Sequence, residues 1–265
     1  MAEITKAQVK LVRSLQLKKN RDEQALFVAE GEKCVSELMK SFEPVLLIAC
    51  ESLPLRTLPA APDGLSWLTA SEVQIEQMSS LRTPQGVLAV FRQPTDVAVL
   101  PPSTLTLVLD GVQDPGNLGT IIRTADWFGV RHIICSIDTA DCFSPKVVQA
   151  TMGALARVKV QYCSLTDWLA GLPKELCVPV YGTLLDGDNL YSVLPSTCRP
   201  KNQRTEAAVI VMGNEGNGIS HDVRRYVTHP VRIPSFPPDA ETSESLNVAI
   251  ATAVVLAEFR RPSSD

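Results

Sequence analysis

The chain has 265 residues, of which 45% are hydrophobic, 20% charged and 5% aromatic, and its formal net charge is −4. This composition is typical of a globular α/β protein and excludes a disordered or fibrous chain. No apolar run reaches the roughly 20 residues that cross a bilayer, and the N-terminus lacks the apolar core of a signal peptide, so we expect a cytoplasmic protein.

The first 97 residues predict a small α/β domain. Helices are expected over about 5–17 and 31–40 and near 71–80, and strands near 45–49, 65–69 and 87–91. Between Lys6 and Arg21 there are six basic residues and no acidic residue. Such a segment can meet phosphates, but a solvated helix face explains it equally well, so the segment alone leaves both interpretations open.

The stretch 93–103, QPTDVAVLPPS, carries three prolines and no helical period. These are features of a boundary between domains. We therefore predict a first domain over 1–97, a linker over 98–103 and a second domain over 104–265.

The second domain predicts a mostly parallel sheet. Six stretches have the near-continuous hydrophobicity of strands that are covered on both faces, and helical segments lie between most of them. The predicted strands are 105–109, 132–135, 158–162, 178–181, 207–212 and 230–233. The last helix carries Leu246, Ile250, Ala253 and Ala257 on one apolar stripe.

Three of these strands run into polar or glycine-rich loops that are followed by helices. In the first loop, Asn117 is suited to cap a helix that begins at Leu118, and Arg123 lies off the buried stripe of that helix. A guanidinium near a helix start can hold a phosphate or carboxylate by two parallel hydrogen bonds. A surface ion pair is the alternative for Arg123.

The second loop, GNEGNG at 213–218, follows a buried strand directly. Its glycines allow backbone amides to approach a ligand, and Glu215 places a carboxylate at the rim, although a tight structural turn explains the pattern as well. The third loop ends in Ser245 and Asn247 at the start of the last helix. We expect Ser243 or Ser245 to cap that helix, and Asn247 has little propensity advantage there.

These loops carry a resemblance to a known family. The segments DPGNLGTIIRTADWFGV, VMGNEGNGIS and IPSFPPDAETSESLNVAIA resemble the three motifs of the SpoU/TrmH branch of the SPOUT RNA methyltransferases, in the same order and spacing. SPKVVQATMGAL also resembles this family. FVAEGEKCVSEL is similar to the ribosomal-protein-like substrate-binding domain that often precedes the catalytic domain.

The resemblance implies an S-adenosylmethionine-dependent methyltransferase that modifies a ribose 2′-hydroxyl in structured ribosomal or transfer RNA, with rRNA favoured over tRNA. It also implies a homodimer formed through the C-terminal domain, and an α/β fold whose C-terminal part forms a trefoil knot. The positions that the resemblance places around the reacting ribose are Asn117, Arg123, Glu215, Ser245 and Asn247. Those that it places around the cofactor are Thr183, Leu184, Gly213, Ile233 and Leu246.

With RNA as the substrate, Lys18, Lys19 and Arg21 become the predicted RNA contacts. Two alternatives stay open: a SPOUT enzyme that methylates a base nitrogen, and a binding protein that keeps the fold without the chemistry. A dinucleotide-binding oxidoreductase is disfavoured because no GxGxxG follows a strand. No metal site is predicted, because the cysteines and histidines never lie at ligand spacing.

Overall fold

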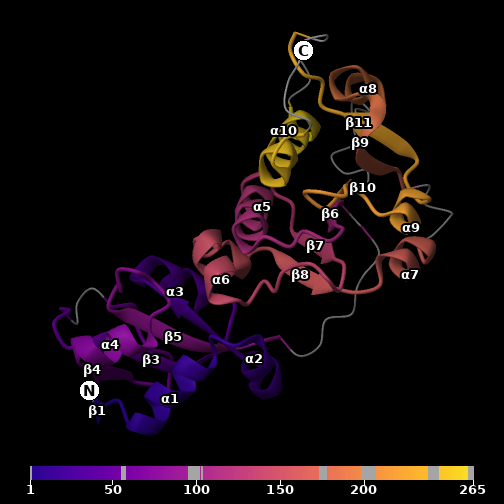
Figure 1. Cartoon of the computed structure of the whole chain (residues 1–265). Coiled ribbons are helices and arrows are strands. Elements are labelled where there is room, and N and C mark those ends of the chain that lie inside the picture. The colour runs from indigo at the N-terminus through magenta and orange to yellow at the C-terminus, as the bar shows by residue number, and fades with distance from the viewer. Residues whose placement is uncertain are drawn as a thin grey trace. The chain divides into compact units, whose positions relative to one another are not determined.

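A computed structural model describes residues 2–54, 58–94, 102, 104–172, 178–197, 207–237 and 245–261. The chain forms two compact units, one of residues 1–97 with 141–157 and the other of residues 98–140 with 158–265 (Figure 1). The first unit therefore includes a segment from the C-terminal part of the sequence. All of the predicted linker except Pro102 lies outside the described residues, so the predicted domain limits stay a prediction.

The first unit is a five-stranded sheet with helices, and its strand order is β1-β4-β3-β5-β2. Strands β2 and β3 each pair antiparallel with β5, whereas β4 pairs parallel with β1 and β3. Its elements are β1 (Ala2–Glu3), α1 (Lys6–Ser14), α2 (Lys18–Gln24), β2 (Leu26–Glu30), α3 (Glu32–Leu38), β3 (Pro44–Cys50), β4 (Trp67–Ala70), α4 (Glu72–Met78), β5 (Val87–Arg92), α6 (Pro145–Thr151) and the short 3₁₀ helix η2 (Ala154–Ala156).

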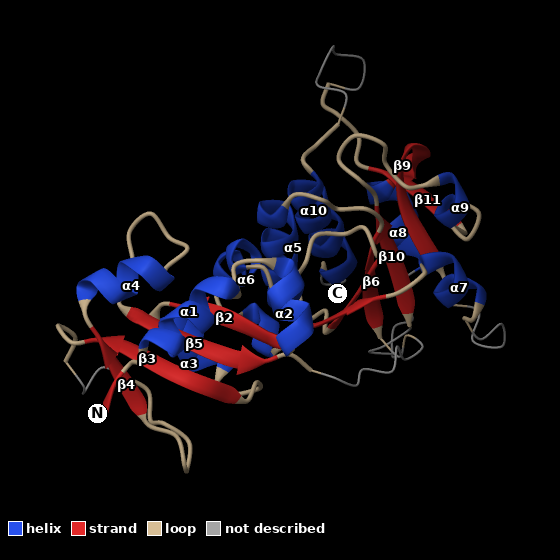
Figure 2. Ribbon diagram, turned by 60° about the horizontal axis from the view of Figure 1, so that its bottom comes forward, coloured by secondary structure: helices blue, strands red, loops and turns tan. Residues whose placement is uncertain are grey.

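The alternation of side chains along β2 and β5 divides the core of this unit into two layers. Val28 and Val90 face α1 and α4, whose buried residues include Val12 and Ile75. On the opposite face Phe27 and Phe91 stack with ring centroids 5.5 Å apart. Figure 2 shows α1 and α4 on one side of this sheet and α3 on the other.

Segment 141–157 completes the second of these layers. The ring of Phe143 lies 4.7 Å from that of Phe27 and 6.2 Å from that of Phe42. Arg157 donates to a carboxylate oxygen of Glu37 at 2.5 Å, and the hydroxyl of Ser41 donates to the carbonyl of Ala156 at 2.7 Å. The segment therefore belongs to the hydrophobic core of the first unit and is not a surface loop.

The expected helix over 5–17 is shorter than predicted. It begins after the capping residue Thr5 and ends at Ser14, and a second helix, α2, starts at Lys18. Between them Leu17 adopts an extended conformation. The spacing of basic residues continues across the gap between α1 and α2 and so does not reveal it. The carbonyls of Leu15 and Gln16 in this gap accept from the side chain of Arg21, a contact that charge spacing cannot predict.

The second unit contains a six-stranded sheet of order β11-β9-β10-β6-β7-β8, in which every pairing is parallel. This confirms the predicted fold class and all six predicted strands. Five of them agree to within one residue at each end, whereas β9 continues to Asn189, well beyond the predicted end at 181. Its elements are β6 (Leu105–Leu109), α5 (Pro115–Trp127), β7 (His132–Cys135), β8 (Lys159–Tyr162), α7 (Leu165–Ala170), β9 (Val180–Asn189), α8 (Leu190–Thr197), β10 (Ala208–Met212), α9 (His221–Arg224), β11 (His229–Arg232) and α10 (Val248–Arg260).

Helices cover both faces of this sheet, as continuous hydrophobic strands require. Helices α5 and α10 contact each other on one side, and α7 and α9 contact each other on the other side (Figure 1). The loops after β6, β10 and β11 all leave from the carboxyl edge, where open α/β sheets bind ligands. No helix among the described residues has the length and hydrophobicity needed to span a membrane.

Candidate active site

The first loop places Asn117 inside helix α5. The helix begins at Pro115, and the side chain of Asp114 caps it by accepting from the amide of Asn117 at 2.8 Å. The prediction that Asn117 caps a helix from Leu118 was therefore wrong. An aspartate followed by proline is the stronger start signal, because proline tolerates the first helical position and lacks the amide that would need a partner. The side chain of Asn117 is consequently free for other contacts.

Three side chains from the three loops form a continuous chain of hydrogen bonds. The amide nitrogen of Asn117 donates to Glu215 Oε1 at 2.9 Å, and its oxygen accepts from Asn247 Nδ2 at 2.9 Å. Asn247 Oδ1 in turn accepts from the backbone amides of Ala249 and Ile250. The structure thus brings together three of the five residues predicted around the ribose.

Asn247, and not Ser243 or Ser245, caps helix α10. Its oxygen points at the helix start, so its amide nitrogen must point away, and this sets the orientation of both asparagines. Asn117 then presents its own nitrogen to the carboxylate. Ser243 lies outside the described residues, and Ser245 is exposed just before the cap.

Arg123 is exposed on α5, and its guanidinium has no hydrogen bond or ion pair with any residue that the structure describes. It lies six residues after Asn117, which is about 240° round the helix at about 100° per residue. Arg123 therefore points away from the chain of hydrogen-bonded side chains formed by Glu215, Asn117 and Asn247. Its surroundings include Trp127, which is 85% exposed one turn further along the same helix.

The loop that carries Glu215 is closed upon itself. The amide of Asn214 donates to the carbonyl of Gly218 at 2.9 Å, and the amide of Gly218 donates back to the carbonyl of Asn214 at 3.0 Å. At Gly213 a Cβ atom would lie 2.2 Å from the carbonyl carbon of Gly218. Only glycine fits there, because the colliding atoms belong to the backbone and cannot rotate away.

Four of the five predicted cofactor positions lie in or directly after three adjacent strands, β9, β10 and β11. Thr183 and Leu184 lie in β9, Gly213 follows β10 and Ile233 follows β11. The pairing of β9 with β11 shifts between Gly182 and Asp188, so residues 183–187 leave the regular ladder. Leu184 in this irregular part of β9 and Ile233 after β11 are both half-buried, so apolar side chains are available to an adenosine. Leu246, the fifth position, is exposed before α10.

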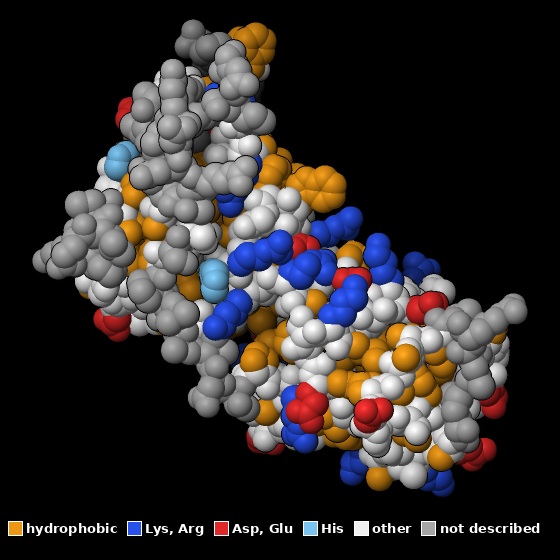
Figure 3. Space-filling view, turned by 180° about the vertical axis from the view of Figure 1, so that it is seen from behind, with side chains coloured by type: hydrophobic (Ala, Val, Ile, Leu, Met, Phe, Trp, Pro, Cys, Tyr) orange, Lys and Arg blue, Asp and Glu red, His pale blue; other side chains and the backbone are white. Residues whose placement is uncertain are grey.

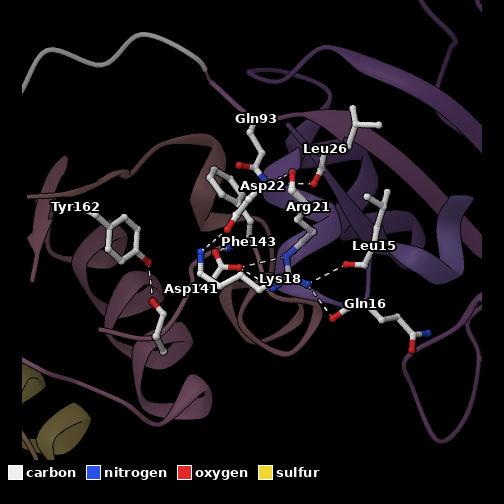
Figure 4. A network of polar contacts seen from close by, with 11 residues as sticks. Leu15, Gln16, Lys18, Arg21, Asp22, Leu26, Gln93, Asp141, Phe143 and Tyr162 are labelled. Carbon is white, nitrogen blue, oxygen red and sulfur yellow. Dashed lines mark hydrogen bonds and ion pairs between the residues drawn. The ribbon is translucent and has the colours of Figure 1, made fainter. Parts of the chain in front are cut away.

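Of the predicted RNA contacts, Lys18 and Lys19 are exposed on α2 and form ion pairs with Asp22 and Glu23. Arg21 is different (Figure 4). Its side chain is only 3% exposed and donates to Asp141 at 3.1 and 2.6 Å, and to the carbonyls of Leu15 and Gln16 at 2.8 Å each. Four of its five N–H groups are thus engaged within the protein, which argues against the predicted direct phosphate contact by Arg21.

The apolar stripe predicted for the last helix does not face the core. Ile250 and Leu246 are exposed, whereas Val248, Ala249, Val255 and Leu256 are buried. Both sides of α10 are apolar, so its periodicity alone did not identify the buried side. Sequence reasoning also missed Asp110 and Asn214, which hold the loops in place. Their signal is a polar side chain within two residues of a buried strand's carboxyl end.

A parallel sheet whose polar loops converge at one edge defines a ligand-binding α/β domain. The family model described as "SpoU rRNA Methylase family" matches residues 104–257, and that of the "MRM3-like substrate binding domain" matches residues 6–89. The first match covers more than half of the chain. The chain therefore belongs to the SpoU rRNA methylase family, as the three motifs predicted.

Relatives match along nearly the whole chain. The 23S rRNA (guanosine(2553)-2'-O)-methyltransferase RlmP of Bacillus subtilis is 31% identical, over 95% of this chain and 95% of that protein. A TrmH-family protein from Porphyromonas gingivalis has a TM-score of 0.86 at 41% identity, covering 98% of this chain and 99% of that chain. An rRNA methyltransferase from Sinorhizobium meliloti with bound AdoMet has a TM-score of 0.81 at 30% identity, covering 98% and 97%.

These matches confirm the predicted enzyme class, an RNA methyltransferase of the SpoU family, and S-adenosylmethionine (AdoMet) as its cofactor. Among the described residues, no group of three or more His, Cys, Asp or Glu side chains could hold a metal ion. The roles of the individual site residues stay predictions.

Proposed function

We propose that this protein transfers a methyl group from S-adenosylmethionine to the 2′-hydroxyl of a ribose in ribosomal RNA. The observation that carries this proposal is the chain of hydrogen bonds from Glu215 through Asn117 to Asn247, which gathers the three family motifs at one edge of the sheet. The similarity to a 23S rRNA methyltransferase favours rRNA over tRNA as the substrate.

Thr183, Leu184, Gly213, Ile233 and Leu246 would hold the cofactor. When bound, S-adenosylmethionine supplies a methyl group on a positively charged sulfur atom, so the protein has no need to activate the donor. What the protein must do is orient the ribose and remove its proton. A closely fitting backbone around Gly213 and the half-buried Thr183 and Leu184 of β9 would hold the cofactor without adding charge near the sulfur.

Glu215 is the best-placed acceptor for the proton of the 2′-hydroxyl. One of its oxygens accepts from Asn117, and the side chain is exposed toward the solvent, so its other oxygen can reach a substrate. The two asparagines hold the carboxylate in one orientation, which is a requirement for a general base. Ser245 and water are the alternative acceptors.

Arg123 acts electrostatically in this proposal. A guanidinium stays protonated in proteins and is a poor base, but it can bind a substrate phosphate and stabilise a developing alkoxide. Because Arg123 points away from Glu215 in its own subunit, we assign it to the active site of a partner subunit.

The exposed apolar face of α5 and α10 supports such a homodimer. Trp127 lies on α5, Leu246 precedes α10 and Ile250 lies in its first turn, and all three are exposed on adjacent helices. Exposed apolar side chains on two adjacent helices are typical of a protein interface. The proposal further includes the trefoil knot of the C-terminal unit and a cytoplasmic location, both of which rest on membership of the family.

RNA would be attracted by local charge. Figure 3 shows exposed Lys and Arg side chains, several of them beside Asp or Glu, so cationic groups are available at the surface although the net charge is −4. Lys18 and Lys19 contribute exposed ammonium groups from α2, where their partners are only exposed carboxylates one turn away. Such surface pairs are weak and can be exchanged for phosphates.

Incubation of the purified protein with radiolabelled S-adenosylmethionine and unmodified rRNA tests the reaction. Ribose methylation makes the labelled linkage resistant to alkaline hydrolysis, whereas base methylation leaves it cleavable. Cofactor binding without any transfer would support a binding protein instead. If the label is found in nucleotides whose linkages alkali cleaves, the methyl group is not on the ribose. The protein would then be a methyltransferase that acts on a base.

Mixed dimers test the assignment of Arg123. Arg123→Ala and Glu215→Gln are each expected to be nearly inactive alone. After unfolding and refolding together, mixed dimers should recover activity, because one of their two sites would contain both intact residues. If mixing restores nothing although sedimentation shows dimers, Arg123 serves its own subunit.

A further inference from the structure

We propose that Asn214 is a positioning residue for Glu215: by bridging to the turn after β6 it holds the carboxylate against Asn117. This inference rests on the proposed function, since Glu215 matters only if a proton must be removed. Asn214 makes no contact with the chain of amides itself. It would therefore act through the loop that carries Glu215.

The side-chain oxygen of Asn214 organises the loop from within. Asn214 Oδ1 accepts from the backbone amides of Gly216 and Asn217, at 2.8 and 3.0 Å. These amides lie on the far side of Glu215 from Asn214, so the oxygen holds the backbone on both sides of the carboxylate. An asparagine that bonds to amides two and three residues onward is a common way to stabilise a turn.

The nitrogen of the same side chain connects this loop to another. Asn214 Nδ2 donates to the carbonyl of Gly111 at 2.7 Å. Gly111 adopts a positive φ of 72°, which favours glycine, directly after β6. The turn at Gly111 leads into α5, so a single amide bridges the loop of Glu215 and the segment that starts the helix of Asn117.

The neighbouring residue, Asp110, secures the other end of the Glu215 loop. Its buried carboxylate accepts from the amide of Ser220 at 2.7 Å. The next residue, Gly111, donates its backbone amide to Ser136 Oγ at 2.8 Å, and the hydroxyls of Ser136 and Thr139 are hydrogen-bonded at 3.0 Å. The turn after β6 is therefore rigidly held, and a loop bridged to it shares that rigidity.

The bridge matters because the bond between Asn117 and Glu215 joins two separate loops and is exposed. An exposed hydrogen bond competes with water and contributes little unless both partners are already in place. Asn214 supplies this preorganisation, and the methyl transfer rate should depend on it although Asn214 touches neither reactant.

Asn214→Asp separates the two functions of the side chain. A carboxylate can still accept from Gly216 and Asn217, so the turn is retained, but it cannot donate to the carbonyl of Gly111. We expect kcat to fall about tenfold, the effect of losing one preorganising hydrogen bond, with the dissociation constant of S-adenosylmethionine changed less than about twofold. Asn217→Asp is the matched control, because it introduces the same charge in the same loop and should leave kcat unchanged.

A double-variant cycle distinguishes positioning from a general structural effect. If Asn214 acts through Glu215, Asn214→Asp should lower the residual rate of Glu215→Gln by less than twofold. If it instead stabilises the whole site, the two losses should multiply. A full tenfold loss in the Glu215→Gln background, or an unchanged kcat of Asn214→Asp alone, would overturn the proposal. Failure of the proposed function is a separate result, since the wild-type protein would then transfer no methyl group to ribose.

Discussion

Replacing Asp141 by asparagine should destabilise the first unit by about 3 kcal/mol. Removal of one partner of a buried ion pair typically costs about 3–5 kcal/mol, because the remaining charge stays buried without compensation. Arg21 is 3% exposed and Asp141 is 15% exposed, so the pair is buried, while the partial exposure of the carboxylate favours the lower end of that range. Asparagine also keeps one oxygen that can accept a hydrogen bond.

The assay is urea unfolding followed by the fluorescence of Trp67, which lies in β4 of the first unit, with the other two tryptophans replaced by phenylalanine. A loss of about 3 kcal/mol should move the unfolding midpoint by about 1–2 M. Asp22→Asn is the matched control. Its ion pair with Lys18 is 2.8 Å long, but the two side chains are 52% and 65% exposed, so the loss should stay below about 0.5 kcal/mol.

A cycle with Arg21→Met identifies the source of the effect. Arg21 and Asp141 should couple by about 2 kcal/mol, so the double variant Arg21→Met with Asp141→Leu should be less destabilised than the sum of the single variants. Two results together would refute this reasoning. Asp141→Asn would have the same free energy of unfolding as Asp22→Asn, and in Arg21→Met the salt dependence of RNA binding would decrease by about one charge. Arg21 would then be an RNA contact after all.

Other outcomes follow from the same structure. Arg123→Ala should lower turnover by roughly 10²–10³ while cofactor affinity, measured by calorimetry, stays nearly unchanged. Gly213→Ala should abolish cofactor binding, because the new Cβ atom would lie 2.2 Å from a backbone carbon, and an unchanged titration curve would contradict this. Lys18→Gln with Lys19→Gln should weaken RNA binding and reduce its salt slope by about two, without affecting cofactor binding. Burial raises the pKa of Cys34 to about 12, so its thiol stays protonated at pH 8 and should react with iodoacetamide only after unfolding; rapid labelling in the native state would contradict this.

The sheet of the C-terminal unit was predictable because local sequence determines it. Each of its strands is covered on both faces, so hydrophobicity is nearly continuous and marks the strands without knowledge of their neighbours. Loops at the carboxyl ends then follow from parallel pairing. Parallel pairing alone therefore predicts Asn117, Glu215 and Asn247 at one edge of the sheet.

The contacts of these side chains were not predictable in the same way. Asp114 and Asn117 are both good capping residues, and the helix start depends on which one finds its amide. Asn247 was singled out for its poor helix propensity, and it does cap α10, but its bond to Asn117 depends on tertiary structure. Capping chemistry thus identified the right residue types and misplaced one helix start by three residues.

The role of segment 141–157 depends on contacts far apart in sequence. Phe143 joins a cluster with Phe27 and Phe42, and Asp141 neutralises Arg21, at separations of more than one hundred residues. A proline-rich stretch near residue 100 predicts a domain boundary there, but composition cannot show that the chain contributes to the first core again forty residues later. For the same reason a basic residue in a basic segment was taken to be exposed.

Helix α10 exposes apolar side chains where the sequence predicts a buried stripe. A helix that buries one face usually carries polar residues on the other, yet Ile250 is exposed opposite the buried Val255 and Leu256, and Leu246 is exposed just before the helix. Its neighbour α5 likewise exposes Trp127. Leaving these side chains in water forgoes roughly 1.5–3 kcal/mol for each aliphatic one. A second subunit that covers the exposed face of α10 would explain its apolar side chains. Ile250→Asp should then produce monomers in sedimentation without unfolding the chain.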